Sequence, residues 1–140
     1  MSDVKTGGCA CGSVRFSATV TDRGVGACHC ETCRKWTGGP FLAIQATGLA
    51  VDSGELLAWR SSDWGERVSC ASCGGTLWFR PLSAPEGVAI VAAGAFDDLD
   101  GSTLAVEIFS DAKPDAYPFL SPDSHKMTRA ETLAQFAPDA

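Results

Sequence analysis

Three of the seven cysteines lie close together in the segment ACHCETCRKW at residues 27–36. Four more form two close pairs, at positions 9 and 11 and at positions 70 and 73. Closely spaced thiolates are a donor set that zinc prefers. An odd number of cysteines cannot pair fully in disulfides within one chain. The spacing therefore predicts metal binding.

The two pairs predict one closed zinc site. A CxC turn at Cys9 and Cys11 and a CxxC turn at Cys70 and Cys73 each offer two thiolates close enough for one tetrahedral ion. Glycines beside both turns supply the backbone freedom that a tight metal-binding turn requires. Four protein thiolates leave no position for a substrate, so we expect this zinc ion to be structural.

The remaining three thiols predict a second zinc site with one open position. Zinc favours four ligands, so Cys28, Cys30 and Cys33 leave room for water, a substrate sulfur or another protein group. His29 is an alternative fourth ligand, but in an extended segment its side chain points away from the face that Cys28 and Cys30 share. Another protein ligand would make both zinc ions structural. We therefore take the three cysteines as candidate catalytic residues and expect two zinc ions per chain.

Charged side chains near the triplet are candidates for substrate contact. Arg34 and Lys35 directly follow the third cysteine, and they either hold a substrate carboxylate or remain ordinary exposed cations. His29 and Glu31 are the nearest titratable groups that could act as a general acid. The four tryptophans could line a pocket, but core packing is the simpler interpretation.

The cysteines are expected at the ends of short strands. Alternating apolar and polar residues at 13–21 predict a half-buried strand, and the continuous apolar run at 88–93 predicts a fully buried one. Other strands are predicted at 4–11, where the strand runs into a turn, and at 25–28, 41–47, 56–60, 66–70, 76–80 and 104–109. One helical turn is predicted near Glu31. The capping-box spacing of Thr128 and Glu131 predicts a short C-terminal helix. The expected fold is mainly β, a single antiparallel β domain over residues 1–140 with two zinc-bearing turns.

Length, composition and charge indicate the number of domains, the class of partner and the compartment. A chain of 140 residues suits one domain, and 45% hydrophobic with 20% charged residues is a globular composition. The net charge of −6 repels phosphate backbones, which argues against a nucleic-acid partner. No apolar run is long enough to span a membrane, and the first residues lack a secretory pattern. We expect a cytoplasmic protein, and in that reducing compartment dense cysteines bind metal more often than they form disulfides.

Four ordered segments resemble the glutathione-dependent formaldehyde-activating enzyme family. They are GGCACGSVRF at 7–16, CHCETCRKWTG at 28–38, RVSCASCGGTL at 67–77 and EIFSDAKPDAYPF at 107–119. The family's tail often has a tryptophan after the KPD-like segment, where this chain has Ala116 and Tyr117. The resemblance implies an Mss-like, β-tent type of fold, similar to that of centromere protein V and of Rab-binding exchange-factor-like proteins. It also implies structural zinc at Cys9, Cys11, Cys70 and Cys73, and reactive zinc at Cys28, Cys30 and Cys33.

The activity that the resemblance implies is that of a carbon–sulfur lyase, with S-(hydroxymethyl)glutathione formation as the named reaction. The residues agree with this chemistry, because an open zinc site lowers the pKa of a small thiol such as glutathione and favours its attack on an aldehyde such as formaldehyde. The reverse reaction would cleave the carbon–sulfur bond. The alternative is a non-enzymatic, zinc-stabilised binding module. The sequence leaves the oligomeric state open.

Overall fold

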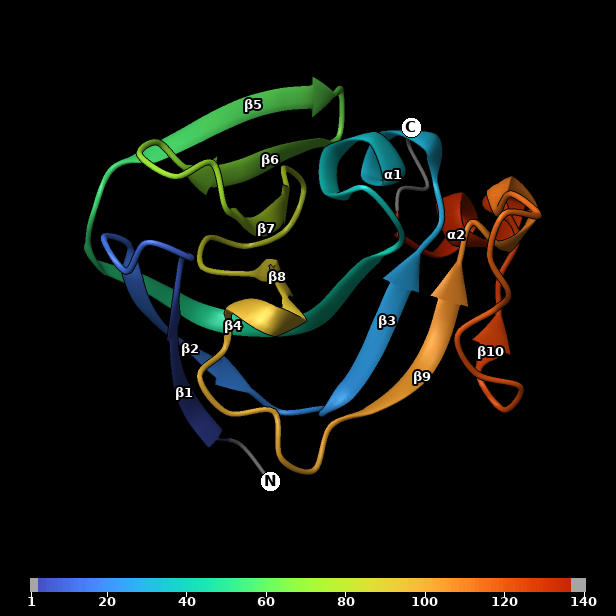
Figure 1. Ribbon diagram of the computed structural model, residues 1–140, viewed down its shortest axis with the longest axis horizontal. Coiled ribbons are helices and arrows are strands. Elements are labelled where there is room, and N and C mark those ends of the chain that lie inside the picture. The colour runs from blue at the N-terminus through green and yellow to red at the C-terminus, as the bar shows by residue number, and fades with distance from the viewer. Residues whose placement is uncertain (1–2, 137–140) are drawn as a thin grey trace. The chain divides into compact units, whose positions relative to one another are not determined.

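The structure is a computed structural model that describes residues 3–136. The chain divides into two compact units, each built from two separate segments of the sequence (Figure 1). The first unit contains residues 1–23 and 43–101, and the second contains residues 24–42 and 102–140. Strands predominate, so the prediction of a mainly β fold is confirmed. That residues 1–140 form a single domain stays a prediction.

The first unit is an antiparallel sheet. Its strands are β1 (Asp3–Gly8), β2 (Arg15–Val20), most of β4 (Phe41–Ser53), β5 (Leu56–Ser62), β6 (Gly65–Cys70), β7 (Thr76–Pro81) and β8 (Ala89–Ala92), followed by the 3₁₀ turn η1 (Ala93–Ala95). The strands pair in the order β1, β2, β4, β8, β7, β6, β5. The chain reversals between β1 and β2 and between β6 and β7 carry the two predicted cysteine pairs.

Alternating apolar and polar residues on β2 contribute to the core of the first unit. On β2 the apolar side chains of Phe16, Ala18 and Val20 are buried, as the sequence predicts. Phe16 packs edge-to-face against Trp78 and Phe96, with ring centroids 5.4 and 5.7 Å apart, which is a favourable geometry for aromatic rings. The sheet thus buries one well-packed face.

Two strands of the first unit differ from expectation. On β8, Ala89 and Val91 are buried but Ile90 and Ala92 are only half-buried, so the prediction of a fully buried strand is wrong. The reason is that an antiparallel sheet can leave one of its faces partly open to solvent. β4 continues to Ser53, well past the predicted residue 47, because its later residues pair with β2.

The second unit combines parallel strand pairs with two helices. Its elements are β3 (Gly24–Cys28), α1 (Glu31–Thr37), β9 (Thr103–Ile108), the 3₁₀ turn η2 (Ser110–Ala112), β10 (His125–Lys126) and α2 (Arg129–Phe136). β9 pairs in parallel with both β3 and β10. The antiparallel pairing expected from the sequence therefore describes the first unit, and the second unit adds parallel pairs.

Local hydrogen bonds and a glycine explain where the helices begin and where α1 ends. The Cys30 sulfur accepts a hydrogen bond from the Cys33 N–H at the start of α1. Gly38 ends this helix with φ of +86°, a conformation that favours glycine, and α1 is longer than the single predicted turn. At the start of α2, Thr128 and Glu131 exchange the two hydrogen bonds of the predicted capping box, at 3.2 and 3.0 Å.

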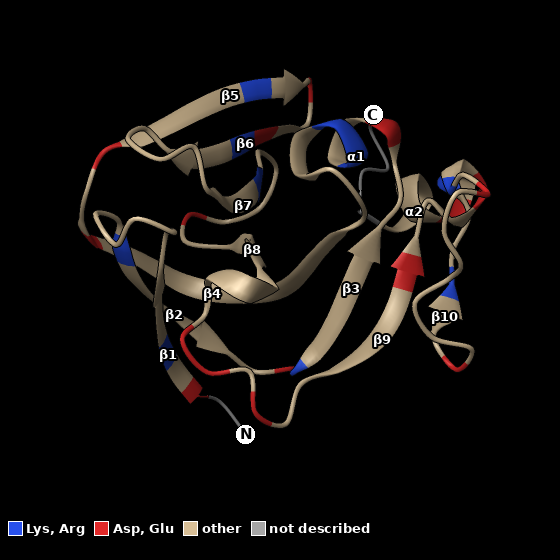
Figure 2. Cartoon of the chain, in the orientation of Figure 1, with Lys and Arg blue, Asp and Glu red and all other residues tan. Residues whose placement is uncertain are grey.

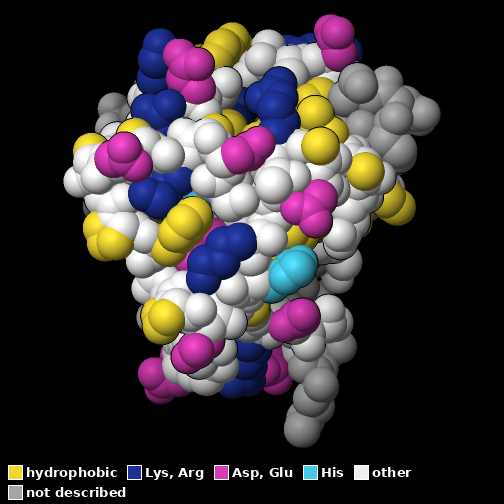
Figure 3. Space-filling view, turned by 90° about the vertical axis from the view of Figure 1, so that its right-hand side faces the viewer, with side chains coloured by type: hydrophobic (Ala, Val, Ile, Leu, Met, Phe, Trp, Pro, Cys, Tyr) yellow, Lys and Arg dark blue, Asp and Glu magenta, His cyan; other side chains and the backbone are white. Residues whose placement is uncertain are grey.

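Charged residues of both signs are spread along the chain. In Figure 2 acidic residues mark many loops, while basic residues lie on helix α1 and on several strands. On the face shown in Figure 3 basic and acidic side chains are interspersed with small apolar groups.

Candidate functional site

The first cysteine cluster lies where two chain reversals of the first unit meet. Cys9 and Cys11 follow β1, Cys70 ends β6, and Cys73 lies in the turn before β7. Their four sulfur atoms all lie within 4.8 Å of one another. Four convergent thiols are a donor set that fits one tetrahedral zinc ion, as the sequence predicts.

Backbone N–H groups point at these sulfurs. Val14 N–H donates to the Cys9 sulfur at 3.2 Å, and this bond is the main reason that the pKa of Cys9 falls to about 5. The N–H groups of Ser72 and Cys73 donate to the Cys70 sulfur. Such bonds stabilise thiolates over thiols. The turn also needs Gly74, whose φ is +74°.

Ser13 is a member of this cluster that sequence reasoning missed. Its hydroxyl lies 3.2 Å from the Cys11 sulfur and 3.4 Å from the Cys70 sulfur. The hydrogen bond from Ser13 is the largest of the causes that lower the pKa of Cys70. Alternation along residues 13–21 predicts only that Ser13 lies on the polar face of a strand. Its position two residues after Cys11 is the signal that could have identified it as a member of the cysteine cluster.

The second cluster is the triplet, and it lies within the second unit. Cys28 ends β3, Cys30 precedes α1, and Cys33 lies in the first turn of that helix. Their sulfurs also lie within 4.8 Å of one another. Cys28 and Cys33 are buried and Cys30 is half-buried.

The three thiols affect one another's ionisation. The neighbouring Cys30 and Cys33 sulfurs, together with burial, raise the pKa of Cys28 far above its usual value. Three thiolates this close together require a cation to share their charge. The donor set of Cys28, Cys30 and Cys33 therefore fits a zinc ion with three protein ligands.

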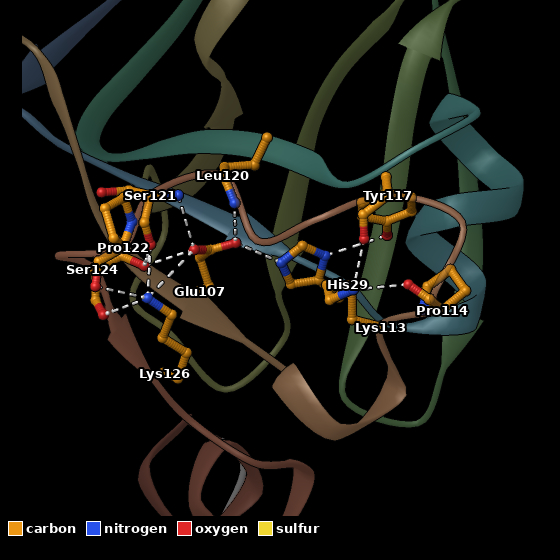
Figure 4. A network of polar contacts seen from close by, with 10 residues as sticks. All are labelled: His29, Glu107, Lys113, Pro114, Tyr117, Leu120, Ser121, Pro122, Ser124 and Lys126. Atoms are coloured by element: carbon orange, nitrogen blue, oxygen red, sulfur yellow. Dashed lines mark hydrogen bonds and ion pairs between the residues drawn. The ribbon is translucent and has the colours of Figure 1, made fainter.

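His29 points away from the triplet sulfurs. Its Nε2 lies 2.8 Å from Glu107 Oε1, and its Nδ1 lies 3.2 Å from the Tyr117 hydroxyl (Figure 4). The His29 and Glu107 side chains are both fully buried. In this arrangement both ring nitrogens have other partners, so the imidazole is not the fourth member of the triplet.

Glu107 is the centre of a buried polar network, which sequence reasoning also missed. Its carboxylate accepts hydrogen bonds from the Ser124 hydroxyl at 2.5 Å and from the Leu120 and Ser121 N–H groups at 3.0 and 3.3 Å (Figure 4). Burial alone would raise the pKa of Glu107, but these bonds and the one from His29 outweigh it and lower the pKa to about 2. Glu107 is therefore ionised at neutral pH.

The two basic residues after the triplet differ in their surroundings. Lys35 lies 3.2 Å from Glu31, and both side chains are largely exposed. This pair has the i, i+4 spacing of an ordinary surface ion pair. The Nε atom of Arg34 is instead buried and has no hydrogen-bond partner among the described residues. Arg34 is therefore half-buried with an unsatisfied Nε, whereas Lys35 is exposed and paired with Glu31.

The tryptophans do not form one wall. Trp78 is buried in the core of the first unit, and Trp64 packs against Phe79 with ring centroids 5.2 Å apart. Trp59 is 54% exposed on β5. In the second unit Trp36 packs against Phe41 at 5.0 Å. Packing explains three of the four, as the simpler interpretation predicted.

Among the residues that the structure describes, no helix is both long enough and apolar enough to cross a membrane.

Comparison with known proteins points to the same family as the cysteine-containing segments of the sequence. The family model described as glutathione-dependent formaldehyde-activating enzyme matches residues 4–112, a range that contains all seven cysteines. A Schizosaccharomyces pombe protein named as an uncharacterised lyase is 32% identical over 120 residues, which cover 84% of this chain and 87% of the relative. A Halomonas elongata protein, provisionally named a glutathione-dependent formaldehyde-activating enzyme, is 31% identical over 120 residues, covering 78% of this chain and 76% of the relative. The chain therefore belongs to the glutathione-dependent formaldehyde-activating enzyme family.

Proposed function

We propose that this protein is a zinc-dependent carbon–sulfur lyase that acts on the adduct of a small thiol, of the S-(hydroxymethyl)glutathione type. In the direction of synthesis the thiol sulfur bonds to an aldehyde carbon, the carbonyl double bond becomes a single bond, and the oxygen takes up one proton in place of the one that the thiol releases. In the reverse direction the carbon–sulfur bond breaks and the aldehyde and thiol are released. The family supports this class of reaction, as do the names of the two relatives, one a lyase and the other provisionally a glutathione-dependent formaldehyde-activating enzyme.

The observation that carries the proposal is the incomplete ligand set of the triplet. Cys28, Cys30 and Cys33 gather without a fourth metal-binding side chain among the described residues. His29, the nearest candidate, is held by Glu107 and Tyr117 instead. A zinc ion bound by these three thiolates would supply a Lewis acid that lowers the pKa of a thiol in the remaining position.

Arg34 supports an anionic thiol as the substrate. A half-buried guanidinium with a buried, unpartnered Nε can bind a carboxylate without first breaking an internal ion pair. Glutathione has two carboxylates, and Arg34 follows Cys33 directly in α1. Lys35 is the weaker candidate because Glu31 already neutralises it. We therefore assign substrate binding to Arg34 ahead of Lys35.

Metal analysis combined with thiol titration tests the proposed function. The purified protein should contain two zinc ions per chain, and glutathione should displace one exchangeable ligand at one of them. The zinc-loaded protein should also accelerate the reaction of glutathione with formaldehyde or its reverse. A second zinc site that is already saturated by protein ligands, or that does not form, would contradict the proposal and favour a non-enzymatic binding module.

A further inference from the structure

β5 is an open edge of the sheet in the first unit. It is the last strand in the pairing order and, among the described residues, it pairs with β6 alone (Figure 1). The opposite edge of this unit, β1, is protected. It carries the charged residues Asp3 and Lys5, and the Asp97 N–H donates a hydrogen bond to its Thr6 carbonyl. Natural sheets usually protect their edges in such ways, because an unprotected edge can pair with another strand.

The backbone of β5 directs hydrogen-bonding groups outward at every second residue. The Glu55 carbonyl accepts a hydrogen bond from the Ala71 N–H at 3.0 Å, on the side of β6. Successive residues of a strand direct their backbone groups to opposite sides, so those of Leu56 and Ala58 face away from β6. The extra residue that interrupts the pairing with β6 comes after Trp59, so the edge is regular up to that residue.

The apolar side chains of β5 are also open to solvent. Leu57 and Trp59 lie two residues apart and therefore share one face of the strand, where they are 58% and 54% exposed. Leu56 is 38% exposed on the other face. Exposed apolar groups that are contiguous along one strand indicate a surface that associates with another molecule.

We propose that β5 pairs with β5 of a second copy of this chain, antiparallel and about a two-fold axis that passes between the two Ala58 residues. A two-fold axis perpendicular to the sheet joins identical edges and keeps equivalent side chains on the same face. In this register Leu57 of each copy lies opposite Trp59 of the other. Such aromatic–aliphatic cross-strand pairs stabilise a sheet. The inference is independent of the proposed function.

The sequence of β5 favours this register over the two nearest symmetric ones. If the axis moved by one residue towards the start of the strand, Trp59 would lie opposite Glu55 of the second copy. If it moved by one residue towards the end, Leu57 would lie opposite Ser61. Each shift places a large apolar side chain opposite a polar one. Among these three registers, the axis at Ala58 alone gives both large side chains an apolar partner.

The charge of β5 is compatible with this pairing. Arg60 is the only charged residue of the strand, and in the proposed register it lies opposite Leu56 of the second copy. The two copies of Arg60 are then four residues apart along the pair, about 14 Å, and salt screens exposed charges beyond about 8 Å. The Arg60 guanidinium also bonds to the Ser62 and Asp63 carbonyls of its own chain, at 3.4 and 3.3 Å.

Sedimentation velocity of the full-length protein at several concentrations tests the proposal, under reducing conditions so that no disulfide joins two chains. One short strand is a small interface, so we expect a reversible monomer–dimer equilibrium. Ala58→Lys should raise the dimer dissociation constant at least about fivefold, because like charges would lie directly opposite each other. Val4→Lys, at a 74% exposed position on β1, is the matched control and should change it by less than about twofold.

An equimolar mixture of Ala58→Lys and Ala58→Glu tests the register. The two variants should bind each other at least about fivefold more tightly than either binds itself, because opposite charges would then lie opposite each other. A mixture that associates no better than the separate variants would overturn the pairing at Ala58. Tighter self-association of Ala58→Glu would also overturn it, since that result indicates a register in which Ala58 lies opposite Arg60. A wild-type protein that remains monomeric up to about 1 mM would overturn the proposal as a whole.

Amide hydrogen exchange tests the same pairing without any substitution. The Ala58 N–H faces away from β6, so its exchange should be fast in dilute protein and should slow as the concentration rises and dimers form. The Leu57 N–H faces β6 and is the internal control, because its exchange should depend much less on concentration. An Ala58 exchange rate that is independent of concentration would contradict the proposed interface.

Discussion

The two cysteine clusters differ in their number of sulfur atoms and in the polar groups around them. In the first cluster four sulfurs converge, backbone N–H groups donate to them, and the Ser13 hydroxyl lies within hydrogen-bond distance of two of them. In the second, three sulfurs converge beside a buried chain of ionisable side chains that does not include them. The first set is complete for zinc and the second is one ligand short. The proposed division into a structural and a reactive site rests on these two differences.

The largest difference should come from removing a ligand of the first cluster. Cys73→Ser should abolish zinc binding there and unfold or aggregate the protein. Structural zinc sites contribute on the order of 10 kcal/mol in small metal-dependent domains, which is comparable to a typical domain's whole stability. Circular dichroism and zinc content per chain measure the outcome. A cooperative thermal transition close to that of the wild-type protein would show that this cluster is not structural.

The matched substitution in the triplet should abolish activity and leave the protein folded. Cys33→Ser should remove one zinc ion and the thiol-dependent activity while the protein stays folded, because hydrogen bonding and packing in the second unit remain. Zinc content, circular dichroism and the rate of the glutathione–formaldehyde reaction are the three measurements. If this variant unfolds as Cys73→Ser is expected to, the distinction between a closed and an open site is wrong.

Acid should affect the buried carboxylate of the second unit differently from a surface carboxylate of the first. The pKa of Glu107 in the folded protein is about 2, below the ordinary value of 4.5. Its ionised form therefore stabilises the fold above pH 4.5, and this stabilisation is lost as the pH falls towards 2. The shift corresponds to roughly 3 kcal/mol. Chemical denaturation at several pH values should therefore show that the stability difference between wild-type protein and Glu107→Gln shrinks over this range.

Glu66→Gln is the control for that measurement. Glu66 pairs with Arg80 at the surface of the first unit, and such pairs contribute little. We expect this variant to remain close to the wild-type protein across the same pH range. A Glu107→Gln difference that does not vary with pH would contradict the assignment of Glu107 as an ionised, hydrogen-bonded centre.

The smallest expected effect concerns the two cations after the triplet. Arg34→Ala should raise the KM for glutathione about tenfold, since one charge-assisted hydrogen bond is lost, and should leave kcat nearly unchanged. Lys35→Ala should change either constant by less than about twofold, because its partner Glu31 is an exposed neighbour. Steady-state kinetics of both variants give the comparison. Equal effects of the two substitutions would remove the reason to assign the carboxylate to Arg34.

Spacing in the sequence was sufficient to predict both cysteine clusters but not the network beside them. Cys28, Cys30 and Cys33 lie close together in sequence where β3 leads into α1, so their separation along the sequence nearly determines their separation in space. Glu107 instead meets His29 from 78 residues away and Ser124 from 17 residues away. Glu107 lies on the predicted strand at 104–109, and a strand prediction from local sequence does not say which of its sides is buried.

Strand pairing is also not determined by local sequence patterns. The strands themselves were predicted close to their observed positions, because alternation is a local property. Parallel pairing of residues 24–28 with residues 103–108 depends on segments far apart in the chain, and no local pattern identifies the partner. The parallel arrangement of the second unit was therefore missed while its strands were found.

Each compact unit is assembled from two separate stretches of chain, and this has a consequence for biosynthesis. All the ligands of the first cluster have been synthesised once residue 73 is made, whereas the second unit needs residues 102–140. The triplet leaves the ribosome early, but Glu107, Tyr117 and Ser124 follow about eighty to a hundred residues later, several seconds at ordinary rates of translation. During that interval three reactive thiols are present without the network that surrounds them in the folded protein. The order of synthesis thus completes the ligand set of the first cluster before the network beside the triplet can form.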